Sequence, residues 1–186
     1  MSELERLREL VPLPFDISEY QGRVSRVREG MQARGIDVLV ISSPENVYYV
    51  CGYQTPAVTL YQNLFLPQDG EPILFLRHIE ECNKIRSWIR KSATYGDSDI
   101  PTQIAAKTLT DAGFGRSTLG VEKQTRKNGN LTVSEFEQLQ HLLPNAKFVD
   151  GSGIVECARL IKSEKELEYI RKACRITERG MQAGID

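Results

Sequence analysis

Residues 36–53 read IDVLVISSPENVYYVCGY and lead from an apolar run into an aromatic one. The run from Ile36 to Ile41 has the length and composition of a buried strand. Pro44 predicts the first turn of a short helix, because proline fits the first helical position. Gly52 predicts the end of that helix, because glycine readily adopts the left-handed conformation that closes helices. The stretch therefore predicts a strand followed at once by a short helix.

The segments on either side of this stretch also carry clear local signals. Upstream, Ser18 and Gln21 have the spacing of a capping box, and apolar residues then recur at helical spacing. Downstream, the pair Asp69–Gly70 predicts a hairpin turn between strands over residues 59–66 and 72–76. A helix before the central strand and a hairpin after it are expected.

The rest of the chain alternates between helical and extended patterns. The expected elements are a helix over 79–89, a strand over 93–95, a helix over 101–112, a strand over 118–121, a helix over 132–143 and a strand over 146–149. Parallel neighbours in a sheet need helical crossovers. This order therefore predicts the α/β class, with a mixed β-sheet flanked by helices on both faces.

Composition and charge exclude several classes of protein. The chain has 186 residues, of which 24 are basic and 25 acidic, so its net charge is -1. A nucleic-acid partner is not expected, because no basic field is available to bind phosphates. No apolar run is long enough to cross a bilayer, so no membrane partner is expected either. The charged N-terminus lacks the apolar core of a secretory signal, which predicts a cytoplasmic location.

The residues that most often bind metals or act as nucleophiles are few and scattered. They are Cys51, Cys82, Cys157, Cys174, His78 and His141. None has the paired spacing of a zinc site, and no glycine-rich phosphate loop is present, so neither a metal site nor a nucleotide site is predicted in this chain. A hydrolase that pairs His78 with Cys51 or Cys82 stays open as an alternative.

Tyrosines gather in the segment from Tyr48 to Tyr61, which follows the predicted strand. Tyr48, Tyr49, Tyr53 and Tyr61 lie there together with Gln54, Thr55 and Pro56. Tyrosine combines apolar area with a polar tip, and this combination is found in pocket walls and interfaces. The pattern leaves open whether the segment lines a pocket or packs in the core.

A long helix is predicted at the end of the chain. Ser163 and Glu166 have capping-box spacing, and Leu167, Ile170, Cys174 and Met181 form an apolar stripe. Such a stripe needs a partner surface, which indicates a second domain after this one.

Four segments taken together resemble a known family. They are SPENVYYVCGY at 43–53, NLFLPQDGEPILFLR at 63–77, Gly-Val-Glu at 120–122 and RLIKSEKEL at 159–167. Their order and spacing are similar to those of the N-terminal domain of the creatinase, prolidase and aminopeptidase P family, the pita-bread metallopeptidases. The resemblance extends from about residue 16 to the end of the chain.

The resemblance implies a fold and a domain organisation. In the family this domain is ribonuclease H-like and has no catalytic residues. The implied division is a lead-in segment over 1–15, the α/β domain over 16–158, and a linker with the first helix of a C-terminal catalytic domain over 159–186. That second domain would hold two divalent metal ions (Mn, Co or Zn) on two Asp, one His and two Glu, and none of these ligands is assigned in this chain.

For the tyrosine-rich segment, the resemblance implies a role between subunits. In the family's oligomers this region reaches the active site of the neighbouring subunit. By position, the residues that would form such a substrate lip are Tyr53, Gln54, Thr55 and Tyr61. The first part of the segment would be core, and Asn46 would cap or close the turn.

The expected function is therefore that of a non-catalytic domain of a cytoplasmic metallohydrolase, which acts on Xaa-Pro dipeptides or Xaa-Pro aminopeptidase substrates. The domain would serve homo-oligomerisation, with a dimer expected, and would shape the neighbouring subunit's substrate pocket. Two alternatives stay open. One is a parent enzyme of the creatinase or ectoine hydrolase type, and the other is a stand-alone module that binds a small ligand or a protein.

Overall fold

The strand within the opening stretch lies at the centre of the sheet. The computed structural model describes residues 11–123 and 131–185, so the lead-in segment up to residue 10 lies outside the described residues. Strand β1 (Val38–Ile41) is buried along its whole length. It pairs antiparallel with β2 (Asn63–Pro67) and parallel with β5 (Thr118–Val121). A strand that is buried on both faces reads as a continuous apolar run, and this one does.

The sheet is mixed, as predicted. Within the described residues it has six strands in the order β4-β3-β2-β1-β5-β6, where β3 is Ile73–Arg77, β4 is Ser92–Tyr95 and β6 is Lys147–Asp150. The predicted hairpin is confirmed, because β2 and β3 are antiparallel neighbours and Gly70 adopts a positive φ of 99° in their turn. Only β2 runs against its neighbours among these strands.

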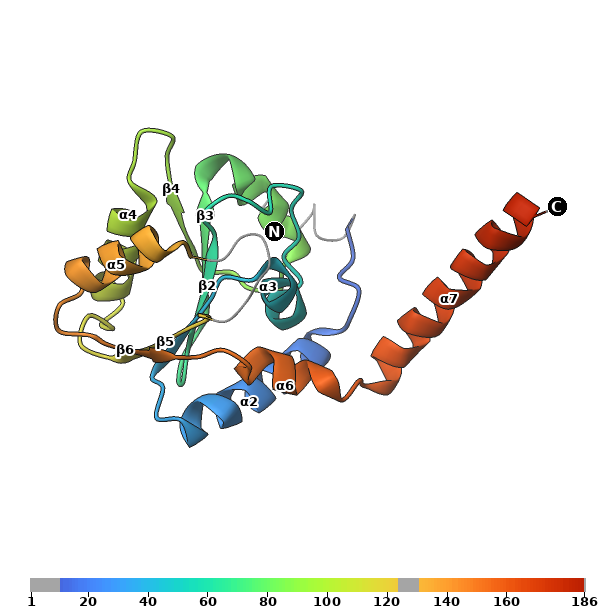
Figure 1. Cartoon of the computed structure of the whole chain (residues 1–186), viewed down its shortest axis with the longest axis horizontal. Coiled ribbons are helices and arrows are strands. Elements are labelled where there is room, and N and C mark those ends of the chain that lie inside the picture. The colour runs from blue at the N-terminus through green and yellow to red at the C-terminus, as the bar shows by residue number, and fades with distance from the viewer. Residues whose placement is uncertain (1–10, 124–130, 186) are drawn as a thin grey trace, which may run out of the picture.

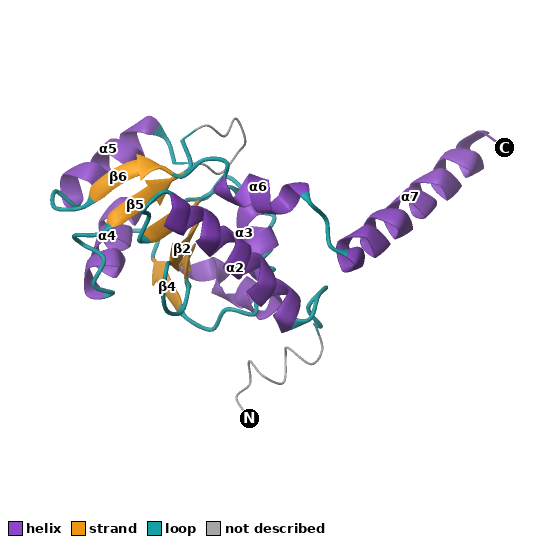
Figure 2. Cartoon of the chain, turned by 90° about the horizontal axis from the view of Figure 1, so that it is seen from below, coloured by secondary structure: helices purple, strands orange, loops and turns teal. Residues whose placement is uncertain are grey.

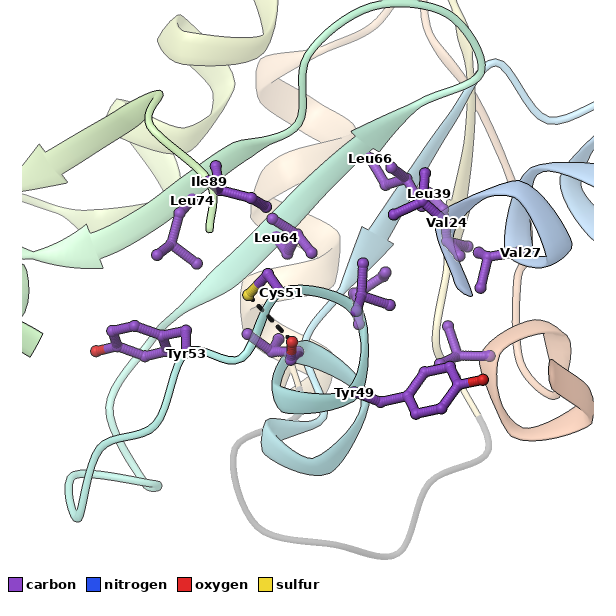
Figure 3. Packing of buried hydrophobic residues seen from close by; sticks show 14 of the residues in the cluster. Val24, Val27, Leu39, Tyr49, Cys51, Tyr53, Leu64, Leu66, Leu74 and Ile89 are labelled. Carbon is purple, nitrogen blue, oxygen red and sulfur yellow. Dashed lines mark hydrogen bonds between the residues drawn. The ribbon is translucent and has the colours of Figure 1, made fainter. Parts of the chain in front are cut away.

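Helices cover both faces of the sheet, which confirms the predicted α/β fold (Figure 1). One face carries α2 (Ile17–Ala33), α3 (Pro44–Cys51) and α6 (Ile154–Leu160), and the other carries α4 (Pro101–Asp111) and α5 (Val133–Leu142). Figure 3 shows the apolar core between the sheet and the helices α2, α3 and α6, where Val24 and Val27 of α2 lie near Leu39 and Leu66 of the sheet. The tyrosine-rich segment begins within α3, and Tyr53 follows that helix on this face.

Three local predictions differ from the structure. The N-cap of α2 is Asp16, so Ser18 lies inside the first turn and makes no capping box there. Strand β2 begins at Asn63 and not at residue 59, because residues 58–60 form a turn. Residues 78–86 form a 3-10 helix, η1 (His78–Arg86), without buried residues, and Ile79 is 67% exposed.

A tertiary contact that cannot be read from the sequence of residues 78–86 fixes the chain just after η1. Just after the helix, the backbone N–H of Trp88 donates to the carbonyl oxygen of Cys51 at 3.2 Å. The indole Nε1 of Trp88 donates to the carbonyl oxygen of Val50 at 3.0 Å. These bonds fix the chain just after η1 to the end of α3, and residues 78–86 before them form a 3-10 helix without buried residues in place of the predicted α-helix.

The last helix, α7 (Glu164–Ile185), projects away from the sheet in both views (Figures 1 and 2). Its predicted capping box is confirmed, since Ser163 and Glu166 exchange hydrogen bonds of 2.8 and 3.2 Å. No residue of α7 among those described is buried. The apolar stripe predicted on this helix is therefore exposed in this chain.

Two glycine substitutions are expected to change stability in opposite directions. A Cβ on Gly151 would lie 2.6 Å from Leu39 Cδ1 and 3.0 Å from the backbone carbon of Gly120, whereas one on Gly22 of α2 meets nothing within 4 Å. We expect Gly151→Ala to lower the free energy of unfolding by about 1–3 kcal/mol, because the strands cannot separate without loss of packing. Gly22→Ala should raise it by about 0.5–1 kcal/mol. Urea unfolding of both variants checks this, and equal signs would contradict it.

Candidate functional site

A cavity of about 1100 Å³ lies beside α3 on the face that carries α2 and α6. Its walls come from α3, the loop that follows it, the end of α6 and the first turns of α7. The residues from these elements on which the argument depends are Tyr48, Tyr53, Gln54, Thr55, Arg159 and Tyr169. This cavity is where the tyrosine-rich segment and the C-terminal part of the chain meet.

Three of the four predicted lip residues line this cavity. Tyr53 is only 3% exposed, Thr55 is nearly buried and Gln54 is exposed. Figure 3 shows the ring of Tyr53 at the edge of the core, with its hydroxyl pointing away from the labelled apolar residues, and that hydroxyl oxygen is itself buried. Burial raises the pKa of Tyr53, so its hydroxyl stays protonated and able to donate a hydrogen bond.

The fourth predicted residue, Tyr61, lies elsewhere. Its ring makes edge contacts with Phe75 at 5.9 Å and with Tyr95 at 6.3 Å between centroids, in the core on the opposite face of the sheet. Its carbonyl oxygen accepts a hydrogen bond from the hydroxyl of Tyr95. Tyr61 therefore fixes the far end of the loop that carries Tyr53.

Asn46 is the centre of a buried polar network. Its Nδ2 donates to Glu122 Oε1 at 2.6 Å and to Glu156 Oε1 at 2.9 Å. Its Oδ1 accepts from Arg159 Nη1 at 2.7 Å. The expectation that Asn46 caps or closes the turn is wrong. The N-cap of α3 is Ser43, and the side-chain amide of Asn46 bonds Glu122, Glu156 and Arg159 instead. Asn46 joins α3, β5 and α6.

Glu122 caps α3 from the end of a neighbouring strand. Its Oε2 accepts from the backbone N–H groups of Ser42 and Ser43 at 2.9 and 2.8 Å. Burial raises the pKa of Glu122, while the hydrogen bonds from Ser43 and Asn46 oppose that rise. Sequence reasoning gave this residue no role. The sequence did contain a signal for it, an acidic residue directly after an apolar strand. The carboxyl ends of parallel strands meet at one edge of a sheet, so this side chain lies next to the residues that follow β1.

A second buried charge, Arg23 of α2, holds the start of α7. Its Nη1 donates to the carbonyl oxygen of Tyr49 at 3.0 Å, and its Nη2 lies 3.1 Å from Glu166 Oε1. The guanidinium lies over the rings of Phe15 and Tyr49, at 4.2 and 4.6 Å from the centroids. These contacts are those of a desolvated cation that is paired and stacked on aromatic faces.

Further contacts hold the first turns of α7 against the segment before α2. Lys165 forms an ion pair with Asp16. The hydroxyl of Tyr169 donates to the carbonyl oxygen of Pro14 at 2.8 Å, and its ring makes an edge contact with Phe15. The beginning of α7 is thus fixed to the α/β domain, and the rest of the helix is not.

The pairing of His78 with a cysteine nucleophile has no support at Cys51. Cys51 is fully buried, its Sγ donates to the carbonyl oxygen of Val47, and burial raises its pKa to about 12. A thiol with such a pKa is inert at neutral pH. The side chain of His78 is exposed on η1, near Glu81.

Over 11–123 and 131–185, no group of three or more His, Cys, Asp and Glu side chains is placed to hold a metal ion. Among the helices of the same ranges, none combines the length and the hydropathy that a membrane crossing requires.

The substitution Asn46→Asp tests the polar network. It replaces the amide donor by a third carboxylate beside Glu122 and Glu156, and we expect a loss of about 3 kcal/mol in the free energy of unfolding at neutral pH. Burial raises the pKa of Glu122, and a new carboxylate beside it favours protonation further, so the variant recovers stability as the pH falls. Urea unfolding at two pH values measures this. Asn145→Asp on the exposed surface is the control, and equal losses in both variants would contradict the network.

The substitution Arg23→Lys tests the attachment of α7. Lysine keeps the charge but lacks the planar fork that pairs with Glu166 and stacks on Phe15. We expect trypsin to cleave between α6 and α7 about fivefold faster, which corresponds to roughly 1 kcal/mol. Arg116→Lys, at an exposed position, is the control. Unchanged cleavage would show that Lys165 and Tyr169 suffice to hold the helix.

The sequence profile of the Creatinase/Prolidase N-terminal domain matches residues 23–161. The ectoine hydrolase of Halomonas elongata is 34% identical over 185 residues, which cover 94% of this chain and 45% of the relative. The Xaa-Pro dipeptidase of Lactobacillus delbrueckii subsp. lactis is 30% identical over 165 residues, which cover 88% of this chain and 44% of the relative. The recombinant prolidase from Thermococcus sibiricus has a similar structure, with a TM-score of 0.74 at 18% identity over 89% of this chain and 44% of that one.

The chain therefore spans less than half the length of each of these proteins. At 18% identity the prolidase structure supports the fold alone, and the fold it shares is the mixed sheet described above. The profile match and the ectoine hydrolase relative cover most of the chain. This chain belongs to the creatinase/prolidase N-terminal domain family.

Proposed function

We propose that this chain is the non-catalytic N-terminal part of a longer hydrolase. In this proposal residues 16–158 form the α/β domain, and residues 159–186 form the linker and the first helix of a C-terminal catalytic domain. Support comes from α7, whose first turns are fixed to the domain while its apolar stripe stays exposed. The stripe includes Ile170, Ala173, Cys174, Met181 and Ile185. The rest of the catalytic domain would cover it.

The role of the domain in this proposal is to form a dimer and to complete the substrate pocket of the neighbouring subunit. The observation that carries it is the convergence of Tyr53, Gln54 and Thr55 at one cavity edge, where Gln54 is exposed and the rings of Tyr48 and Tyr53 line the same cavity. Such a surface suits a small, partly apolar substrate. Tyr61 contributes by fixing the end of the loop.

The proposed substrates are Xaa-Pro dipeptides, in line with the relative that is named an Xaa-Pro dipeptidase. A second candidate is cleavage of a C–N bond in a small osmolyte, which the 34% identity with an ectoine hydrolase favours. In either case the chemistry belongs to the catalytic domain. The described residues offer no cluster for the two divalent metal ions (Mn, Co or Zn) that we place there.

Activity assays on this chain and on the longer gene product test the proposal. With added manganese, we expect the 186-residue chain to hydrolyse neither Ala-Pro, ectoine nor creatine, and the longer product to hydrolyse one of them. In the longer product, Gln54→Ala should raise KM about tenfold at nearly unchanged kcat, the equivalent of one lost hydrogen bond. Gln140→Ala, at an exposed position on α5, is the matched control. Hydrolysis by the short chain would refute the proposal.

Mixed dimers test whether the loop acts on the neighbouring subunit. A Gln54→Ala subunit is combined with a subunit whose catalytic domain has been inactivated. If the loop reaches across the dimer, the mixture contains active sites with an intact loop, and part of the normal KM returns. A mixture that keeps the raised KM would show that the loop serves its own subunit.

A further inference from the structure

The loop that carries Tyr53 and Gln54 contains one buried anchor. Thr55 lies between the exposed residues Gln54 and Pro56, yet it is nearly buried. Its Oγ1 accepts a hydrogen bond from the backbone N–H of Ala57 at 3.0 Å. The same hydroxyl donates to Glu80 Oε2. Thr55 thus fixes the turn of the loop and links it to another element, η1.

Glu80 is itself held in a fixed orientation on η1. Its Oε2 also accepts from Asn83 Nδ2 at 3.0 Å, so one carboxylate oxygen joins the loop to the helix. Further contacts hold the second half of η1 and the residues just after it. Lys84 Nζ donates to Ser92 Oγ of β4 at 2.7 Å, and Trp88 bonds the last residues of α3. Glu80 therefore presents a rigidly placed acceptor to a loop that otherwise runs over the surface.

We propose that Glu80 is a positioning residue for the substrate lip, acting through Thr55 on the placement of Tyr53 and Gln54. This inference rests on the proposed function of that loop. A hydrogen bond from a hydroxyl to a carboxylate is charge-assisted and is stronger than a bond between neutral groups. A displacement of about 1 Å in a positioning group can cost a large factor in rate or binding. The bond between Thr55 and Glu80 would set the position at which Tyr53 and Gln54 meet the substrate.

Hydrogen exchange on the 186-residue chain tests the positioning directly. In Glu80→Ala, we expect the backbone amides of residues 54, 55 and 57–60 to exchange about tenfold faster, because the loop loses its charged acceptor. Glu81→Ala is the matched control, since Glu81 carries the same charge on the same helix. Its carboxylate accepts a hydrogen bond from Ser92 of β4, whereas that of Glu80 accepts one from Thr55 of the loop. Glu80→Gln keeps an acceptor oxygen and should restore most of the protection.

A double-mutant cycle confirms that the effect passes through Thr55. Thr55→Val should speed exchange of the same segment, and adding Glu80→Ala should have little further effect there, because the bond between Thr55 and Glu80 is already lost in Thr55→Val. Additive effects, or unchanged exchange in Glu80→Ala, would overturn the inference and leave the proposed function of the loop intact.

Kinetics of the longer enzyme separate the two ideas. We expect Glu80→Ala to raise KM severalfold with a smaller change in kcat, and Glu80→Gln to recover most of the loss. If exchange speeds up but neither Glu80→Ala nor Gln54→Ala changes KM, the loop does not shape the substrate pocket. The proposed function and the inference then fail together. Raised KM values in Gln54→Ala alone would refute only the role of Glu80.

Discussion

Glu122 has to keep its hydrogen-bond donors, because a carboxylate left unpaired in the interior costs several kcal/mol. Its donors come from the start of α3 and from Asn46, which in turn contacts α6. The position of α3 on the sheet therefore follows from a polar requirement as well as from apolar packing. Since the loop that carries Tyr53 begins where α3 ends, the placement of this loop depends on this one carboxylate.

Arg23 imposes a similar constraint on the other side of α3. It bonds the carbonyl oxygen of Tyr49 and pairs with Glu166 at the start of α7. A buried cation is stable only while its partners stay in place. The two buried charges thus lie on either side of α3. Each is also linked to the C-terminal part of the chain, because Asn46 bonds both Glu122 and Arg159, and Arg23 pairs with Glu166. The loop and the beginning of α7 are held by the same framework.

The sequence predicted those features whose causes are local. The apolar run of β1, the turn at Asp69–Gly70 and the end of α3 at Gly52 all have their signal within a few residues, and the structure confirms them. The features it did not predict arise from distant partners. Glu122 receives its donors from 76 to 80 positions away, and the chain after η1 is fixed by bonds between Trp88 and the end of α3.

The candidate site follows the same division. Composition indicated a tyrosine-rich segment but left its role open, and only the family resemblance pointed to Tyr53, Gln54, Thr55 and Tyr61. The cavity contains the first three, because they follow α3 on one face, while the chain crosses to the other face before Tyr61. That crossing has a physical use. Because the two ends of the loop are packed in separate cores, the loop cannot move as a rigid unit. Its middle is then held by one further contact, the hydrogen bond from Thr55 to Glu80.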